Sequence, residues 1–127
     1  MDCGDAFMID DEDEADEHLQ VVLTKPTLDG EVITVPICTR YRWSETLVCV
    51  EPSEHGHPFI QHSSVVSYRH ARIRKCAAID RAIESGKARP KKRVSENLLT
   101  RMQRGVLDSD FVSNEVRAFF KDCYPTL

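Results

Sequence analysis

Short apolar segments follow one another closely through the first half of the chain, and they limit the folds that it can adopt. Each is four to eight residues long and contains β-branched side chains, and most are bounded by Pro, Gly or acidic residues. Such segments are typical of strands, and many short strands in close succession are typical of a small barrel or sandwich. The strands expected on this basis cover residues 6–9, 19–24, 31–38, 46–50 and 64–68.

The third of these segments has a proline in its interior. Because side chains alternate between the two faces of a strand, Val32, Thr34 and Cys38 are expected to share one face with Pro36. Proline has no N–H group to donate to a neighbouring strand. We therefore expect an edge strand or a bulge at Pro36.

After residue 70 the apolar pattern changes to the spacing of helices. Ser is a favoured N-cap residue, and Gly is favoured just after the last turn of a helix. These signals separate three amphipathic stretches from one another. The expected helices cover 77–83, ending before Gly86; 96–104, between Ser95 and Gly105; and a last segment that begins after Ser113.

Two of these helices have an apolar stripe at helical spacing, which predicts the face that they bury. The basic segment 87–93, which contains Pro90, shows no such spacing and is expected as a loop. The side chains expected to form the buried stripes are Leu98, Leu99 and Met102, and then Val116, Phe119 and Phe120.

The length and composition of the chain fit one ordered domain. It has 127 residues, of which 41% are apolar and 30% are charged, as in ordinary globular proteins. We expect a single domain over 1–127, with a barrel portion over 1–76 and a helical portion over 77–127. The expected fold class is mainly β with C-terminal helices, a small barrel of about five strands followed by two or three short helices.

Charge is distributed unevenly along the chain. Residues 1–20 contain nine Asp and Glu and no Lys or Arg, whereas residues 69–104 contain twelve Lys and Arg and three acids. An asymmetry of this kind indicates a polyanionic partner. The alternative is a solvated surface whose acidic and basic parts attract one another. The acidic run 10–17 itself is expected as a solvated loop, with Mg²⁺ binding, screening of a basic groove or contact with a basic partner as its other uses.

The cysteines and the N-terminus indicate a cytoplasmic protein. No two of the five cysteines form a CxxC pair, so we expect reduced thiols rather than a disulfide framework or a zinc site. No apolar run approaches the roughly 20 residues of a membrane helix, and the N-terminus lacks the basic start of a signal peptide. Phosphate-loop, zinc-protease and serine-hydrolase motifs are absent, which disfavours NTPases, zinc proteases and serine hydrolases. We expect no metal and no cofactor.

Four pieces of the sequence together resemble a known family. They are GDAFMID at 4–10, VVLT at 21–24, VPICT at 35–39 and a run that begins with HPFI at 57–60. In this order they are similar to the MazF/PemK toxins of bacterial toxin–antitoxin systems, and the similarity extends over about residues 4–105. Each piece is a weak motif by itself, and the ordered combination carries the resemblance.

The resemblance implies an SH3-like barrel with C-terminal helices, usually dimeric, that cuts single-stranded RNA without a metal ion. It also implies a cognate antitoxin peptide bound across the RNA groove. In that family an Arg at the start of the second strand and a Thr at the end of the third serve cleavage. Here His18 stands in the place of the Arg, and Cys38 aligns with the Thr, which follows as Thr39.

Cleavage of RNA by its own 2′-hydroxyl needs a base, an acid and groups that stabilise charge on the phosphate. Histidine suits both proton transfers because its pKa lies near neutrality. We therefore expect His18 and His62 to transfer protons, with Thr39 donating to the phosphate and Arg40 neutralising it. The alternative is that His18 ends a strand in solvent and that His62 packs against or caps a turn.

Further residues are candidates for binding the substrate. Tyr68 could stack on a base or lie in the core of the barrel. Arg72 and Arg74, expected to share a strand face with His70, could follow a phosphate backbone. Cys38 is a weaker candidate, as a nucleophile, because no clear set of His and Asn or Asp accompanies it.

Two other classes of function stay open at this point. One is a barrel without catalytic activity that binds RNA or a protein partner. The other is an adaptor in which the acidic N-terminus contacts a basic surface of another protein. The sequence leaves open whether the protein is a monomer or a homodimer.

Overall fold

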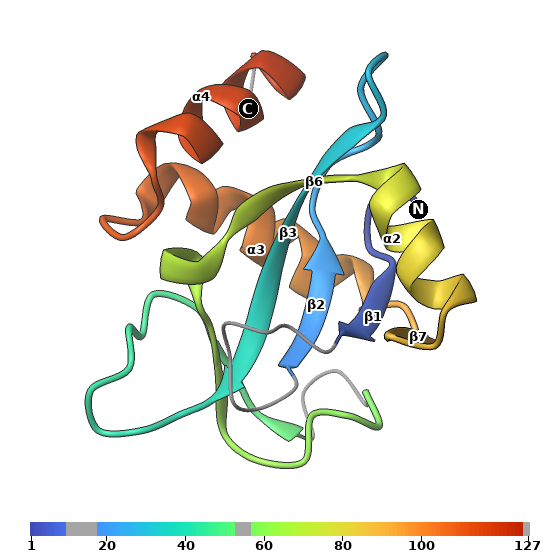
Figure 1. The fold of residues 1–127 in the computed structure, drawn as a ribbon. Coiled ribbons are helices and arrows are strands. Elements are labelled where there is room, and N and C mark those ends of the chain that lie inside the picture. Colours follow the sequence, from blue (N-terminus) through green and yellow to red (C-terminus); the bar gives the residue numbers. More distant parts are fainter. Residues whose placement is uncertain (10–17, 53–56, 126–127) are drawn as a thin grey trace.

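A computed structural model describes residues 1–9, 18–52 and 57–125 (Figure 1). Its strands form one antiparallel sheet in the order β4-β5-β3-β2-β1-β7, with β6 paired to β3 outside this path. The expected fold class, mainly β with C-terminal helices, is confirmed. The strands are β1 (Ala6–Ile9), β2 (His18–Val22), β3 (Glu31–Thr39), β4 (Cys49–Val50), β5 (Ser64–Val66), β6 (Arg72–Lys75) and β7 (Ala88–Lys91). The helices are η1 (Tyr68–His70), α2 (Cys76–Glu84), α3 (Glu96–Asp108) and α4 (Asn114–Cys123).

Strand β3 is the central strand, and Pro36 lies where its partner changes. β3 pairs with β2 along one side; on the other side it pairs first with β6, over 31–34, and then with β5, over 37–39. Pro36 falls between these two partners, and its carbonyl accepts a hydrogen bond from the Ser67 N–H (2.9 Å). The expectation of an edge strand or a bulge is therefore wrong. An interior strand tolerates this proline because no ladder bond is required at the gap.

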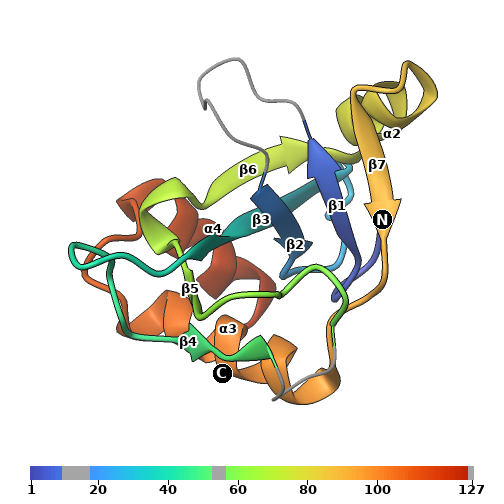
Figure 2. The same cartoon turned by 90° about the horizontal axis from the view of Figure 1, so that it is seen from below.

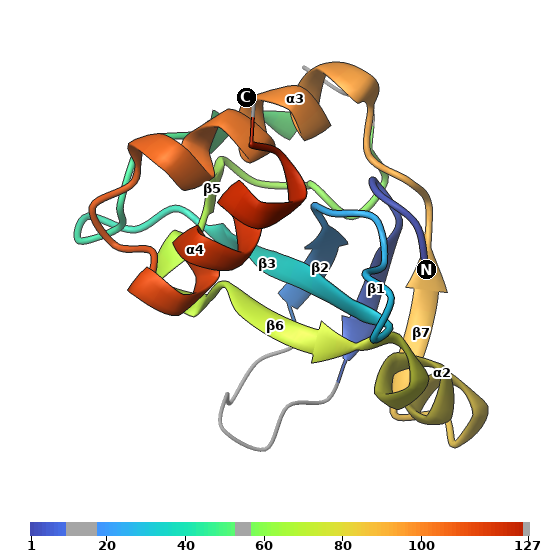
Figure 3. The ribbon, with the colours of Figure 1, turned by 90° about the horizontal axis from the view of Figure 1, so that it is seen from above.

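The two faces of the sheet have separate cores. Ile33 and Val35 of β3 pack with Leu98 and Met102 of α3 in the larger core. The alternate residues of the strands, whose side chains point to the other face of the sheet, form a smaller core that includes Ile79 of α2. Accordingly, α3 and α4 lie on one side of the sheet and α2 on the other (Figure 3). The strand ends that carry the candidate site lie away from α2 (Figure 2).

The predicted serine N-caps and buried stripes agree with the structure. The Ser95 hydroxyl accepts from the Leu98 N–H (3.1 Å), and the Ser113 hydroxyl accepts from the Val116 N–H (3.2 Å). These bonds satisfy N–H groups that have no partner within the helix. Five of the six predicted stripe residues are buried, and the sixth, Phe119, is partly buried. The buried five are Leu98, Leu99, Met102, Val116 and Phe120.

The segment expected as a basic loop is a strand. β7 pairs with β1, with Ala6 opposite Lys91 and Ile9 opposite Ala88. Pro90 is compatible with this assignment because β7 is at the end of the sheet. The sheet therefore has seven described strands rather than about five, and the region 77–127 is not entirely helical.

Other boundaries differ from the expected ones. The segment 46–50 is a strand only at its last two residues, and β5 stops at Val66 because Tyr68 begins the short helix η1. His70 belongs to η1 and not to β6, so the predicted row with Arg72 and Arg74 on one strand is wrong. Helix α3 continues through Gly105 to Asp108.

A histidine joins the two ends of the sheet. His57, between β4 and β5, has its Nε2 atom 2.6 Å from the carbonyl oxygen of Lys92, which follows β7. The Phe59 N–H donates to the other ring nitrogen, Nδ1 (3.1 Å). Nε2 therefore carries the proton and donates it to Lys92. His57 therefore has a structural role, in a turn that the hydrogen bond from the Ile60 N–H to the His57 carbonyl oxygen (3.1 Å) closes.

Candidate active site

The start of β2 and the end of β3 meet because the two strands are antiparallel. Leu19 pairs with Ile37, which places His18 near Cys38, and Thr39 pairs with Ser64 of β5. His62 precedes Ser64 by two residues. The topology thus brings residues that are 44 positions apart in sequence, 18 and 62, to one end of the sheet.

Three predicted catalytic residues, His18, Thr39 and His62, line one cavity of about 110 Å³. His18 is partly exposed, and Thr39 and His62 are exposed. The imidazoles and the hydroxyl are therefore accessible from solvent, as groups that act on an external substrate must be. The rest of the wall consists of Met8, Leu19, Ile37, Phe59, Ile60, Gln61 and Ser64.

Local hydrogen bonds hold the segment around His62. The Ser64 hydroxyl donates to the carbonyl oxygen of His62 (2.8 Å), and the Ser63 hydroxyl donates to the Glu51 carboxylate (2.6 Å). The Arg40 N–H donates to the carbonyl oxygen of Ser63 (2.8 Å) and continues the pairing beyond Thr39. The backbone that carries His62 is thereby tied to the backbone that carries Thr39.

A second hollow, of about 480 Å³, adjoins the first and shares His18 and Thr39 with it. At its edge the Ser67 hydroxyl and the Nδ1 atom of His70 lie 2.8 Å apart. The other lining residues are Cys38, Tyr41, Trp43, Ser44, Glu45, Val65 and Arg69. A hollow of this size is in the range of small-ligand pockets.

Cations lie near both hollows. The ammonium of Lys91 is 4.3 Å from the ring centroid of Phe59, which lines the first hollow. The guanidinium of Arg69, in the second, is 4.7 Å from the ring centroid of Phe111. Arg40 is exposed directly after Thr39. The site can therefore attract a phosphate group.

Tyr68 lies in the core and not at the site. Its side chain has no exposed surface, and its hydroxyl donates to the carbonyl oxygen of Met102 (2.8 Å). Burial raises the pKa of the phenol, and the nearby Glu45 carboxylate raises it further. The prediction that Tyr68 stacks on a base is wrong, and its alternative, a core residue, is what the structure shows.

Arg72 and Arg74 lie on β6, where they pair with Thr34 and Val32 of β3. The Nε–H of Arg74 donates to the Thr34 hydroxyl (2.9 Å). Neither arginine lines either hollow. The structure thus brings His18, Thr39 and His62 to one cavity, with Arg40 next to Thr39 in sequence but in the lining of neither hollow. The acidic run 10–17 and His55 lie outside the described residues.

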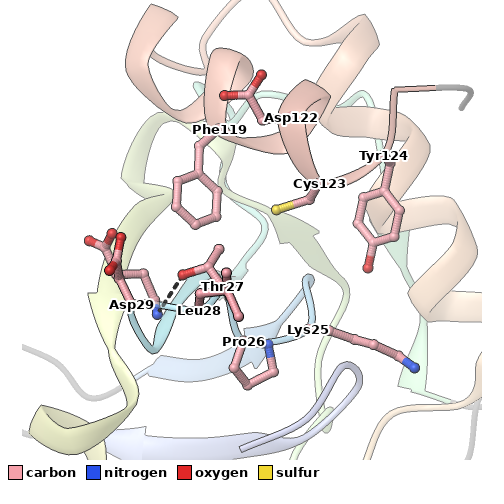
Figure 4. Close-up of a pocket in the computed structure, with 10 residues that line it drawn as sticks. Lys25, Pro26, Thr27, Leu28, Asp29, Phe119, Asp122, Cys123 and Tyr124 are labelled. Carbon is pink, nitrogen blue, oxygen red and sulfur yellow. Dashed lines mark hydrogen bonds between the residues drawn. The ribbon is translucent and has the colours of Figure 1, made fainter.

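A third cavity, of about 510 Å³, opens at the far end of β2, between the turn that starts at Lys25 and the end of α4 (Figure 4). Its candidate nucleophile is Cys123. Burial raises the pKa of this thiol, and the Asp122 carboxylate raises it further. A protonated thiol is a weak nucleophile, and no histidine is among the described residues that line the cavity. This cavity is a weaker candidate than the end of the sheet that carries His18.

Sequence reasoning missed the aromatic side chains of the site, Tyr41, Trp43 and Phe59. A signal for the first two was present, because Arg and aromatic residues alternate over 40–43, directly after Thr39. Basic residues interleaved with aromatic ones are typical of surfaces that bind single-stranded nucleic acid.

Comparison with known proteins adds no identification. No protein-family model matches the chain, and no curated protein sequence matches it. The similarity to MazF/PemK toxins therefore stays a prediction from the sequence. Over the described ranges, no helix is both long enough and apolar enough to cross a membrane.

Proposed function

We propose that this protein is a MazF/PemK-like endoribonuclease that cuts single-stranded RNA without a metal ion. The observation that carries the proposal is the common cavity of His18, Thr39 and His62. Two imidazoles and a hydroxyl around one accessible cavity are the groups that general acid–base cleavage of RNA requires. Arg40, which is exposed and follows Thr39 in sequence, supplies charge for the phosphate.

The proposed reaction is a transfer within the RNA. The 2′-oxygen attacks the adjacent phosphorus, the bond from phosphorus to the 5′-oxygen breaks, and a 2′,3′-cyclic phosphate forms. One histidine of the pair takes the 2′-hydroxyl proton, and the other gives a proton to the leaving 5′-oxygen. Thr39 and Arg40 stabilise the charge on the phosphate oxygens in the transition state.

By the same resemblance, we propose a cytoplasmic toxin that a cognate antitoxin peptide holds inactive, and that acts as a homodimer. A peptide across the two hollows would cover His18 and Thr39 together, because both residues line both hollows. Copurification of the toxin with the product of a neighbouring gene tests the antitoxin, and sedimentation of the pure chain tests the homodimer.

The direct test is incubation of the purified protein with a 5′-labelled single-stranded RNA in EDTA. We expect fragments with 2′,3′-cyclic phosphate ends from the wild type and none from His18→Ala or His62→Ala. Arg81→Ala, an exposed position on α2, is the matched control and should cleave normally. A DNA of the same sequence, which lacks the 2′-hydroxyl, should stay intact. Normal turnover by folded His18→Ala would refute the mechanism.

The second candidate function is a barrel that binds RNA without cutting it. The exposed aromatic side chains of the second hollow favour it, since they serve binding and not proton transfer. It predicts intact RNA in the same assay, with binding that weakens as salt increases.

A further inference from the structure

Two aromatic rings stack on the surface beside the candidate active site. The ring centroids of Tyr41 and Trp43 are 5.2 Å apart, with an angle of 7° between the ring planes. Tyr41 is 54% exposed and Trp43 is 79% exposed. The pair therefore presents a flat apolar surface to solvent, and Tyr and Trp are enriched where proteins contact a partner.

A tight turn holds this pair in place. The Tyr41 N–H donates to the Ser44 hydroxyl (2.8 Å), and the Ser44 N–H donates back to the Tyr41 carbonyl oxygen (3.2 Å). The turn begins directly after Arg40, whose N–H is bound to Ser63. Because the backbone is already ordered, a ligand that stacks on the rings loses little conformational entropy of the loop.

The stacked pair belongs to the same surface as the proposed catalytic residues. Tyr41 and Trp43 line the second hollow together with His18 and Thr39. Tyr41 is only two residues beyond Thr39 in sequence. A polymer chain with its reacting phosphate at Thr39 would therefore place an adjoining unit within reach of the rings.

The charges around the pair suit a phosphodiester chain. Arg40 and Arg42 flank Tyr41, and both are exposed. Among the residues that the structure describes, no carboxylate forms an ion pair with either arginine. The acid nearest the turn in sequence, Glu45, accepts hydrogen bonds from the N–H groups of Tyr68 (3.0 Å) and Arg69 (3.1 Å).

We propose that the Tyr41–Trp43 pair is the platform on which a base of single-stranded RNA stacks, next to the bond that is cut. The base extends the stack on the exposed face of Trp43, and Arg40 and Arg42 contact the flanking phosphates. This inference rests on the proposed function, because RNA is its ligand. In this proposal, the aromatic pair of the turn 41–44 stacks on the base, a role for which Tyr68 was a candidate from the sequence.

The chain offers its own probe, since Trp43 is its only tryptophan. The test titrates the whole protein in EDTA with a 2′-O-methyl RNA oligonucleotide, which cannot be cleaved because it lacks the free nucleophile. We expect the Trp43 fluorescence to be quenched on binding, and an oligonucleotide with abasic sites to give no quenching. Loss of one stacked base corresponds to a weakening of about tenfold to hundredfold.

Variants distinguish the loss of base stacking from the loss of any exposed apolar side chain. With a fluorescein-labelled oligonucleotide, Trp43→Ala should bind about tenfold to hundredfold more weakly, and Trp43→Phe should retain most of the affinity. Leu28→Ala removes another exposed apolar side chain, at the far end of β2, and should bind normally. Arg42→Ala should bind more weakly and reduce the dependence of affinity on salt.

The outcomes distinguish this inference from the proposed nuclease. Quenching of Trp43 by the oligonucleotide, without cleavage of ordinary RNA, supports base stacking on the pair and refutes the nuclease, and with it the placement of the pair beside a cut bond. Cleavage of RNA with an unchanged KM for Trp43→Ala refutes the platform and leaves the nuclease standing. Absence of any binding at low salt also overturns the platform.

Discussion

The hydroxyl of Tyr68 occupies the space next to Gly105 that any side chain at position 105 would need. A Cβ atom added at Gly105 would overlap the Tyr68 oxygen and its ring carbons. The same hydroxyl donates to Met102, one turn earlier in α3. Gly105 lies inside the helix instead of ending it, and its missing side chain lets the tyrosine approach the helix backbone.

Gly105→Ala tests this contact. Helix propensity alone favours Ala by about 1 kcal/mol, but overpacking of a tight core costs about 1–3 kcal/mol. We expect the overlap to prevail, so that urea denaturation gives a lower free energy of unfolding. Thr100→Ala, at an exposed position of the same helix, should change stability by less than about 0.5 kcal/mol. Unchanged or higher stability of Gly105→Ala would show that Tyr68 does not fill this space.

Buried and half-buried phenols predict a loss of stability at alkaline pH. Burial raises the pKa of Tyr68, and burial together with Cys3 raises the pKa of Tyr124 to about 12, whereas a phenol in the unfolded chain ionises near pH 10. The neutral phenols therefore make their full contribution to the free energy of unfolding below about pH 10, and this contribution is lost as the pH rises to about 12. Denaturant melts at pH 9 and pH 11 measure it.

Tyr68→Phe separates the two phenols in this experiment. Loss of the hydrogen bond to Met102 should cost about 0.5–1.5 kcal/mol at neutral pH. The remaining loss of stability between pH 9 and pH 11 should be smaller than in the wild type, because one ionising group is gone. An identical alkaline loss in both proteins would mean that Tyr68 ionises as freely in the folded chain as in the unfolded one.

His57→Ala tests the bridge between the ends of the sheet. The substitution leaves the Lys92 carbonyl and the Phe59 N–H without the imidazole, and a polar group that loses its partner costs about 1–3 kcal/mol. We expect a lower melting temperature by calorimetry. Ser85→Ala removes a hydroxyl that donates to Ala82 at an exposed position, and it should melt like the wild type. Equal melting of the two variants would contradict the bridge.

Thr39→Val tests the proposed donor to the phosphate. The substitution keeps the β-branched shape that a strand favours and removes only the hydroxyl. If Thr39 stabilises the transition state, kcat for RNA cleavage should fall about a hundredfold with little change in KM. Thr100→Val is the matched control on α3 and should cleave at the normal rate. A large rise in KM with normal kcat would assign Thr39 to substrate binding instead.

Local sequence signals predicted the elements that depend on local physics. The short apolar run at 6–9 predicted β1 to its residue limits, and the serines at 95 and 113 predicted the starts of α3 and α4. The expectation that His18 and Thr39 lie near one groove came from the resemblance. The antiparallel pairing of β2 with β3 explains why the two residues meet. These features follow from side-chain periodicity and from capping bonds within a few residues.

Tertiary structure alone decided the rest. The segment Ala88–Lys91 has no strand-like pattern, and it becomes β7 because β1 offers an unpaired edge to its backbone. Position 105 has no room for a side chain because a residue 37 positions earlier, Tyr68, packs against it. Sequence by itself thus determined the fold class and most elements, whereas pairing between distant segments decided which side chains are buried and which, like Trp43, face solvent beside His18 and Thr39.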